Sequence, residues 1–139
     1  MNNACVIDAS VTVAWCFSDE STPAGTQLLA RLQEAEAWVP GLWLVEVANV
    51  LLAAERRRRI TRGLVTEFLS MLAGLTIRID AELDHRIHGP VLHLARLYRL
   101  TVYDAMYLDV AMRLKLPLAT RDRELMNAAR SAAVPLIPA

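Results

Sequence analysis

The sequence predicts an α/β fold in which a mainly parallel β-sheet lies between helices on both faces, as a three-layer sandwich. Short apolar runs of strand length alternate along the chain with longer segments of helical periodicity. This alternation is typical of parallel strands joined by crossover helices. Such crossovers are right-handed, and they place helices on both sides of the sheet.

The chain of 139 residues is expected to form a single domain, residues 1–139, with a sizeable buried core. Hydrophobic residues make up 55% of the sequence and charged residues 22%, which is typical of a globular protein rather than a disordered one. The formal net charge is zero. Any contact with nucleic acid would therefore depend on a local basic patch rather than on an overall field.

The sequence also predicts a cytoplasmic protein with no membrane segment. No apolar run approaches the roughly 18 residues that a membrane span needs, and the N-terminus lacks the basic start of a signal peptide. The two cysteines, Cys5 and Cys16, lie in apolar surroundings without a spaced partner. We expect both to be free thiols in a reducing compartment.

The first half of the chain is expected to contain two strands and four helices. Residues 4–7 are an apolar run that ends at Asp8, as in a buried parallel strand. Pro23 follows the capping residues Ser21 and Thr22 and suits the first position of a helix. The expected strands are residues 4–7 and 37–40, and the expected helices are residues 9–15, 23–36, 42–58 and 61–72.

The second half is expected to contain three strands and three helices. Residues 76–79 alternate in polarity and are rich in β-branched side chains, so they indicate a strand. Residues 81–89 are ambiguous and are expected to form a single helical turn, after which Pro90 begins a helix. The expected strands are residues 76–79, 116–119 and an edge strand at 135–137, where proline is tolerated. The expected helices are residues 90–97, 101–114 and 123–130.

Acidic residues from four separate segments are expected at one edge of this sheet. They follow the first and fourth strands or lie near the starts of two helices: Asp8, Glu46, Asp104 and Asp122. The carboxyl ends of parallel strands meet at the same edge, where α/β domains bind their ligands. Helix N-termini at that edge add free N–H groups and partial positive charge, which favour a phosphate.

A cluster of this kind predicts a metal ion. Two carboxylates 4 Å apart repel by about 4 kcal/mol at an effective dielectric constant near 20, so they must bind a cation or take up protons. Oxygen ligands without cysteine or histidine select a hard ion such as Mg²⁺ or Mn²⁺. Because Mg²⁺ retains waters and prefers substrate phosphates, phosphodiester hydrolysis is the expected chemistry, with a carboxylate helping to deprotonate the attacking water.

Each of the four acids also has a purely structural explanation. Asp8 and Asp122 can cap the helices that follow them. Asp104 stands three residues after Thr101 in a pattern close to a capping box. Glu46 is harder to explain in this way, because it lies among leucines and valines, where an unpaired carboxylate is costly. The residues alone leave caps and a metal site open as alternatives.

Four segments resemble the motifs of PIN-domain ribonucleases, and most closely those of the VapC toxins of bacterial type II toxin–antitoxin systems. The segments are VIDASV, LVEVANVL, TVYDAMYLDVAMRL and LPLATRDREL. The resemblance covers nearly the whole chain, and the Y-D-A and L-P-L-A-T-x-D sequences are its most specific part. It implies a five-stranded parallel sheet between helices, a Mg²⁺-dependent endoribonuclease, a homodimer and inhibition by a cognate antitoxin.

The resemblance also implies roles for individual residues. The metal-binding and catalytic acids would be Asp8, Glu46, Asp104 and Asp122. Hydrogen-bonding support would come from Thr120, Ser10 and Asn49. The arginines on either side of the last acid, Arg121 and Arg123, are placed to contact RNA.

Three other features are expected to lie outside this site. Asp109 departs from the family pattern and falls about 140° round the helix from Asp104, so we expect it on the surface or at a dimer interface. The arginine run at residues 56–59 suits a solvated helix end, with RNA binding as the alternative. His85 and His88 have helical spacing, but no further ligand is adjacent and Gly89–Pro90 interrupts the helix.

The sequence therefore predicts a Mg²⁺- or Mn²⁺-dependent endoribonuclease that is the toxin of a toxin–antitoxin pair. The alternative is a catalytically weak PIN-fold module that mainly engages the antitoxin in a regulatory complex. A phosphatase or phosphoacceptor domain is disfavoured, because no second acid stands two residues after Asp8 and the sole lysine, Lys115, lies far from its helix start.

Overall fold

Four short strands form one parallel sheet in the order β3-β2-β1-β4 in the computed structural model, which describes residues 3–139. The strands are β1 (Cys5–Ile7), β2 (Ala37–Val39), β3 (Ile77–Ile79) and β4 (Leu118–Ala119). In β1, Val6 pairs with Trp38 on one side and Leu118 on the other. The strand order therefore changes direction between β1 and β4, which is where ligands bind in open α/β sheets.

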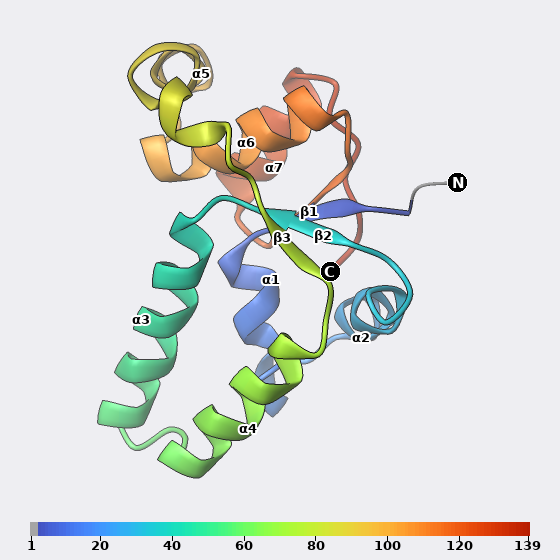
Figure 1. Ribbon diagram of the computed structural model, residues 1–139, viewed down its shortest axis with the longest axis vertical. Coiled ribbons are helices and arrows are strands. Elements are labelled where there is room, and N and C mark those ends of the chain that lie inside the picture. Colours follow the sequence, from blue (N-terminus) through green and yellow to red (C-terminus); the bar gives the residue numbers. More distant parts are fainter. Residues whose placement is uncertain (1–2) are drawn as a thin grey trace.

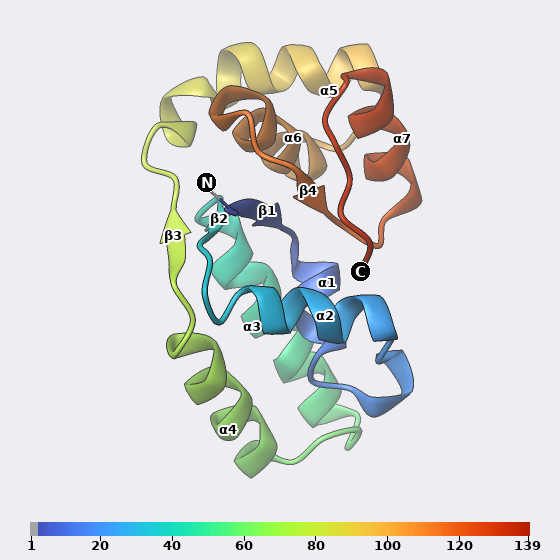
Figure 2. The ribbon, with the colours of Figure 1, turned by 90° about the vertical axis from the view of Figure 1, so that its right-hand side faces the viewer.

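Helices cover both faces of the sheet, as Figures 1 and 2 show, so the expected α/β sandwich is confirmed. One layer consists of α1 (Ala9–Ala14), α2 (Pro23–Arg31), α3 (Leu42–Arg56) and α4 (Arg62–Ala73). The other consists of α5 (Leu92–Tyr98), α6 (Val102–Leu114) and α7 (Arg123–Ser131). No helix within residues 3–139 is both long and apolar enough to cross a bilayer.

The expected fifth strand at residues 135–137 is reduced to a single parallel bridge between Leu118 and Leu136. Leu118 donates to the Pro135 carbonyl, and Ile137 donates to the Leu118 carbonyl, both at 2.9 Å. Pro135 has no N–H to extend this ladder, and β4 offers only two residues for pairing. The sheet therefore has four strands rather than five.

The structure corrects several expected boundaries. α2 ends at Arg31 rather than near residue 36, because Gln33 bonds the carbonyl three residues before it and tightens the turn. α3 ends at Arg56, shortly before Arg58 adopts a left-handed conformation with φ of 59°. The expected helix start at Pro90 is also wrong.

Pro90 lies inside a short π-helix, η3 (Ile87–Val91), which follows a 3₁₀ helix, η2 (Leu83–Arg86). Proline lacks the N–H that a regular helical ladder needs, and α5 begins only after this wide turn. A further 3₁₀ turn, η1 (Ser18–Glu20), connects α1 with α2.

α6 is the most deeply buried helix of the described chain. Seven consecutive residues, 105–111, are buried, because α6 contacts β1, β2 and β4 on one side and α5 and α7 on the other. A helix that is covered all round carries apolar residues on every face. Any polar side chain in this segment therefore needs a partner inside the protein.

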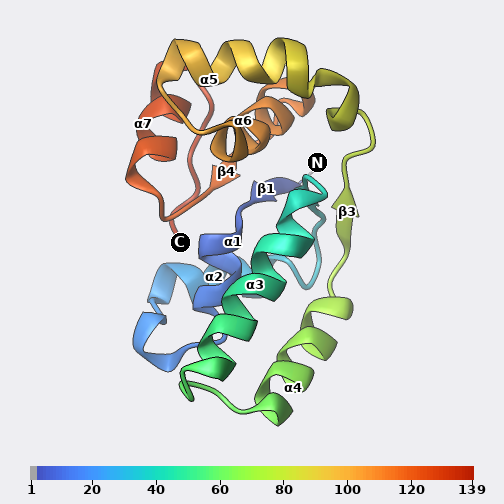
Figure 3. The same ribbon diagram turned by 90° about the vertical axis from the view of Figure 1, so that its left-hand side faces the viewer.

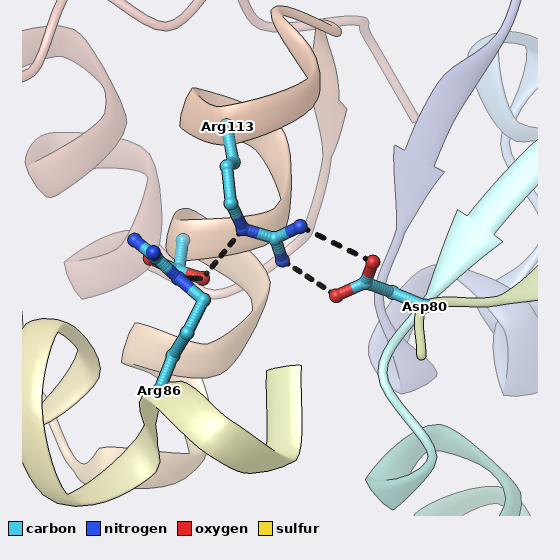
Figure 4. A network of polar contacts seen from close by, with 4 residues as sticks. Asp80, Arg86 and Arg113 are labelled. Carbon is cyan, nitrogen blue, oxygen red and sulfur yellow. Dashed lines mark hydrogen bonds and ion pairs between the residues drawn. The ribbon is translucent and has the colours of Figure 1, made fainter. Parts of the chain in front are cut away.

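Asp109 meets that need in a network of ion pairs with Asp80, Arg86 and Arg113 (Figure 4). The Arg86 Nη2 to Asp109 Oδ1 distance is 2.9 Å, and Arg113 Nε lies 3.2 Å from Asp109 Oδ2. Arg113 also binds both oxygens of Asp80, which directly follows β3. Asp109 is only 2% exposed, so the expected surface position is wrong: η2 covers the side of α6 that faces away from Asp104.

Candidate active site

The sheet topology brings the four candidate acids from separate segments to one edge. Asp8 directly follows β1, and Asp122 follows the neighbouring strand β4. Glu46 lies in the second turn of α3, and Asp104 lies in the first turn of α6. Asp122 raises the pKa of Asp8, Asp8 raises that of Glu46, and all three raise that of Asp104, so the carboxylates lie within electrostatic reach of one another.

Asp8 is the most buried of these acids, with 5% of its surface exposed. Its Oδ1 accepts hydrogen bonds from the Ser10 hydroxyl at 2.6 Å and the Val11 N–H at 3.1 Å, and Oδ2 accepts one from the Thr120 hydroxyl. Burial raises the pKa of Asp8, these hydrogen bonds lower it, and Asp122 raises it, with a net upward shift. A carboxylate has about four acceptor positions, so one remains for a further ligand.

Two hydroxyl groups connect the turn after β1 with the turn after β4. Thr120 Oγ1, which donates to Asp8, also accepts from the Asp122 N–H at 3.0 Å. Ser10 Oγ accepts from the Arg121 N–H at 3.0 Å. Partners of this kind orient the carboxylates that bind a metal. Asp8 and Asp122 also cap α1 and α7. The two acids therefore act as helix caps and lie at the same edge of the sheet, so one role does not exclude the other.

The pKa of Asp104 is raised by its burial and by the acids around it. Burial is the main cause, and it raises the Asp104 pKa to about 6 together with repulsion from four carboxylates, those of Asp122, Asp8, Glu46 and Glu124. The N-cap of α6 is Thr101, whose hydroxyl accepts from the Asp104 N–H at 3.1 Å. The charges that act on Asp104 leave the region with an excess of negative charge, which a cation would neutralise.

Glu46 has a partner that the sequence did not identify. The Tyr107 hydroxyl donates to Glu46 Oε1 from α6, one turn beyond Asp104. Burial raises the pKa of Glu46, the bond from Tyr107 lowers it, and Asp8 raises it, with a net upward shift. The signal available in the sequence was the position of Tyr107, three residues after Asp104 in a mostly apolar helix. A buried tyrosine hydroxyl usually has a hydrogen-bond partner, so a polar partner was to be expected there.

Within residues 3–139, the side chains of the remaining expected residues form no hydrogen bond or ion pair with the four acids. Asn49 is exposed one turn beyond Glu46, and no hydrogen bond given for the described residues joins it to the cluster. Arg121 and Arg123 are exposed on either side of Asp122. Arg121 Nη1 donates to the Glu20 carbonyl at 2.8 Å. Roles for these residues in binding stay predictions.

The donor set suits a hard divalent ion, because it consists of carboxylate oxygens with excess negative charge. Within residues 3–139, however, no three Asp, Glu, His or Cys side chains are grouped closely enough to enclose an ion. Mg²⁺ commonly uses one or two protein carboxylates, keeps several waters and takes oxygens from substrate phosphates. The residues present therefore fit a partly hydrated ion rather than one enclosed by protein ligands.

Comparisons with known proteins identify relatives of this fold. The chain is similar to the crystal structure of PAE2754 from Pyrobaculum aerophilum, with 26% identity, a TM-score of 0.68, and coverage of 92% of this chain and 87% of that one. It is also similar in fold to a toxin–antitoxin complex from Klebsiella pneumoniae, with 18% identity, a TM-score of 0.56, and coverage of 85% and 86%. A search of curated proteins found no match.

The model of the PIN-domain family matches residues 5–131. This match confirms the PIN-domain part of the resemblance seen in the sequence, and PIN domains are generally nucleases. With nearly the whole chain covered, the protein belongs to the PIN-domain family.

Proposed function

We propose that this PIN domain is a Mg²⁺- or Mn²⁺-dependent endoribonuclease and the toxin, of VapC type, in a type II toxin–antitoxin pair. The observation that carries the proposal is geometric: Asp8 and Asp122 follow neighbouring parallel strands, and the Thr120 hydroxyl bonds both the Asp8 carboxylate and the Asp122 N–H. The carboxylates of Asp8, Glu46 and Asp122 also repel that of Asp104. These acids approach one another from four elements at the point where the strand order changes direction. Repulsion of this kind is retained where a cation offsets it.

Each side chain has a defined part in the proposed reaction. A bound divalent ion would supply Lewis-acid polarisation of the phosphoryl group and activation of water. Asp8 and Asp104 would hold the ion, and the hydroxyls of Ser10 and Thr120 would fix the Asp8 carboxylate, to which both donate. Glu46 uses one oxygen for its hydrogen bond, and its second oxygen would help to hold the ion and accept the proton of the attacking water.

RNA is the proposed substrate, bound outside the acids by exposed arginines. Arg121 and Arg123 are exposed next to Asp122, and guanidinium groups bind phosphates in bidentate fashion. Such contacts position the backbone without reading its sequence. By resemblance to the VapC toxins, the active form is proposed to be a cytoplasmic homodimer.

The surface for the antitoxin is proposed to be an apolar groove between α3, α4 and β3. Figure 3 shows α3 and α4 side by side. The groove measures about 370 Å³, and its lining includes Leu44, Leu69 and Ile79, which are 54%, 44% and 42% exposed. Exposed arginines at positions 56–58 and 62 lie at the other end of the two helices, around the connection between them. A segment with apolar and acidic side chains would fit this combination.

Cleavage of RNA by the purified chain tests the nuclease activity. We expect Mg²⁺ or Mn²⁺ to permit cleavage, and either EDTA or Asp104→Asn to abolish it. The products should carry 3′-hydroxyl and 5′-phosphate ends, because water attacks the phosphorus and the 3′ oxygen leaves. Cleavage that resists both EDTA and Asp104→Asn would contradict the proposal. Stable antitoxin binding without any cleavage would support the alternative of a catalytically weak binding module.

Growth of a bacterial host tests the role as a toxin. Induction of the native chain should arrest growth, and co-expression of the antitoxin should restore it. Asp104→Asn should be tolerated at the same expression level. Equal arrest by native protein and variant would argue against a catalytic toxin.

A further inference from the structure

We infer that Tyr107 is a positioning residue of the candidate site, which holds the Glu46 carboxylate in one orientation and leaves its second oxygen for the reaction. The inference rests on the proposed function, since it states how one acid of that site is held. Tyr107 belongs to neither the predicted acids nor their predicted hydroxyl partners. Its contact joins α6 to α3 across 61 residues of sequence.

The Tyr107 hydroxyl lies where three elements of the site meet. It donates to Glu46 Oε1 on α3. The backbone N–H of Ala9, the first residue of α1, is near enough to the hydroxyl to lower the pKa of Tyr107, although burial and Glu46 raise it overall. Ala9 is adjacent to Asp8 in the chain, so one hydroxyl group connects the surroundings of two of the acids. A group with both donor and acceptor capacity can serve such a junction.

The tyrosine is much more rigid than the carboxylate that it contacts. Tyr107 is 1% exposed in the middle of the buried segment of α6, and its ring has only two side-chain torsions. The ion pairs of Arg113 with Asp80 and Asp109 hold the same helix against the end of β3 (Figure 4). Glu46 is half-buried and has a longer, more flexible side chain. The rigid partner therefore determines where the flexible one lies.

Tyr107→Phe separates positioning from packing, because it removes the hydroxyl and keeps the buried ring. A purely structural hydroxyl would affect stability and leave ion binding unchanged. Loss of a hydrogen-bond partner of a metal-binding carboxylate costs about 10–100-fold in metal affinity. We expect Tyr107→Phe to weaken Mn²⁺ binding about ten-fold, measured by calorimetry on the protein without RNA. The Mn²⁺ concentration for half-maximal RNA cleavage should rise by a similar factor.

Tyr103→Phe is the matched control, since it makes the same substitution on the same helix at a side chain that is 60% exposed. It should leave Mn²⁺ affinity unchanged. In a Glu46→Gln background, Tyr107→Phe should cause little further loss, because the carboxylate through which it acts is already gone. An equal ten-fold loss in both backgrounds would overturn the inference.

A second measurement remains available if Tyr107→Phe fails to fold. The chain has three tyrosines, so Tyr98→Phe and Tyr103→Phe together leave Tyr107 as the single site for fluorotyrosine labelling. Its ¹⁹F resonance should shift when Mg²⁺ saturates the protein, and the shift should be lost in Glu46→Gln.

Unchanged Mn²⁺ affinity in folded Tyr107→Phe, or no Mg²⁺-dependent shift in the labelled protein, would overturn the positioning role while native cleavage upheld the nuclease. A native protein that neither binds Mn²⁺ nor cleaves RNA would instead contradict the proposed function, and this inference with it.

Discussion

Replacing Asp104 by asparagine should stabilise the metal-free protein at pH 8. Asp104 is half-buried, and the side chains that act most strongly on its pKa are carboxylates. The cap of α6 is supplied by Thr101, so the substitution leaves that cap in place. Asparagine keeps the shape of the side chain and removes the charge. The substitution therefore removes the cost of burying this carboxylate together with its repulsion from the other acids.

The magnitude follows from the pKa of Asp104, which is raised from 3.8 to about 6. At about 1.4 kcal/mol per unit, the charged form would cost the folded state roughly 3 kcal/mol. Solvent around this half-buried group screens part of that cost, so we expect about 1.5 kcal/mol. With an unfolding entropy of roughly 2.1 cal/mol/K per residue, this corresponds to a rise in Tm of about 5 °C.

The pH dependence fixes the sign of the effect. Because the folded-state pKa of Asp104 is raised, the folded protein binds more protons than the unfolded chain between about pH 4 and pH 6. Stability therefore falls as the pH rises through this window and stays lower above it. The advantage of Asp104→Asn should be near zero at pH 4 and complete at pH 8, in thermal unfolding with EDTA.

A bound cation should reverse the order of stability of the native protein and Asp104→Asn. Saturating Mg²⁺ should raise the Tm of the native protein, because a ligand that binds only the folded state stabilises it, and it should raise that of Asp104→Asn by less. Glu67→Gln, at an exposed acid on α4, is the control and should change stability by less than about 0.5 kcal/mol. An Asp104→Asn protein that is no more stable than native at pH 8, with a difference independent of pH, would refute the reasoning.

Three further substitutions test other parts of the structure. Arg113→Met should lower the free energy of unfolding by about 3–5 kcal/mol in urea, because it leaves the buried Asp80 without its ion-pair partner and Asp109 with Arg86 alone; a loss below about 1 kcal/mol would show that the network contributes little. Thr120→Val should weaken Mn²⁺ binding about 10–100-fold in calorimetry, since the hydroxyl that donates to Asp8 is lost, and unchanged binding would exclude that role. Leu69→Asp in the α3–α4 groove should weaken antitoxin binding and leave RNA cleavage intact; unchanged antitoxin affinity would place the partner elsewhere.

Helix starts that have a capping side chain were predictable, because that signal is local. Thr22, Thr61, Thr101 and Asp122 each cap the helix that begins at the next residue. A capping side chain bonds an N–H three residues ahead, so the sequence contains both partners of the contact. The same locality explains why the apolar strand at residues 4–7 was found.

Features that depend on distant partners were missed or misplaced. The edge strand at residues 135–137 became one bridge, because its length depends on how much of β4 is available to pair with it. Asp109 was expected at the surface, since the helical angle shows only that it points away from Asp104. Whether that side of α6 meets solvent or η2 depends on the tertiary arrangement.

The candidate site likewise has features that the sequence predicted and features that only the tertiary structure showed. The sequence by itself identified the PIN-domain motifs and four acids near strand ends and helix starts, because motif spacing and chain order are properties of the sequence. Only the tertiary structure showed that the Thr120 hydroxyl reaches Asp8 across 112 residues and that the Tyr107 hydroxyl reaches Glu46 across 61. Such contacts depend on the pairing of parallel strands and on the burial of α6. Both arise from interactions between segments, so no single segment of the sequence contains them.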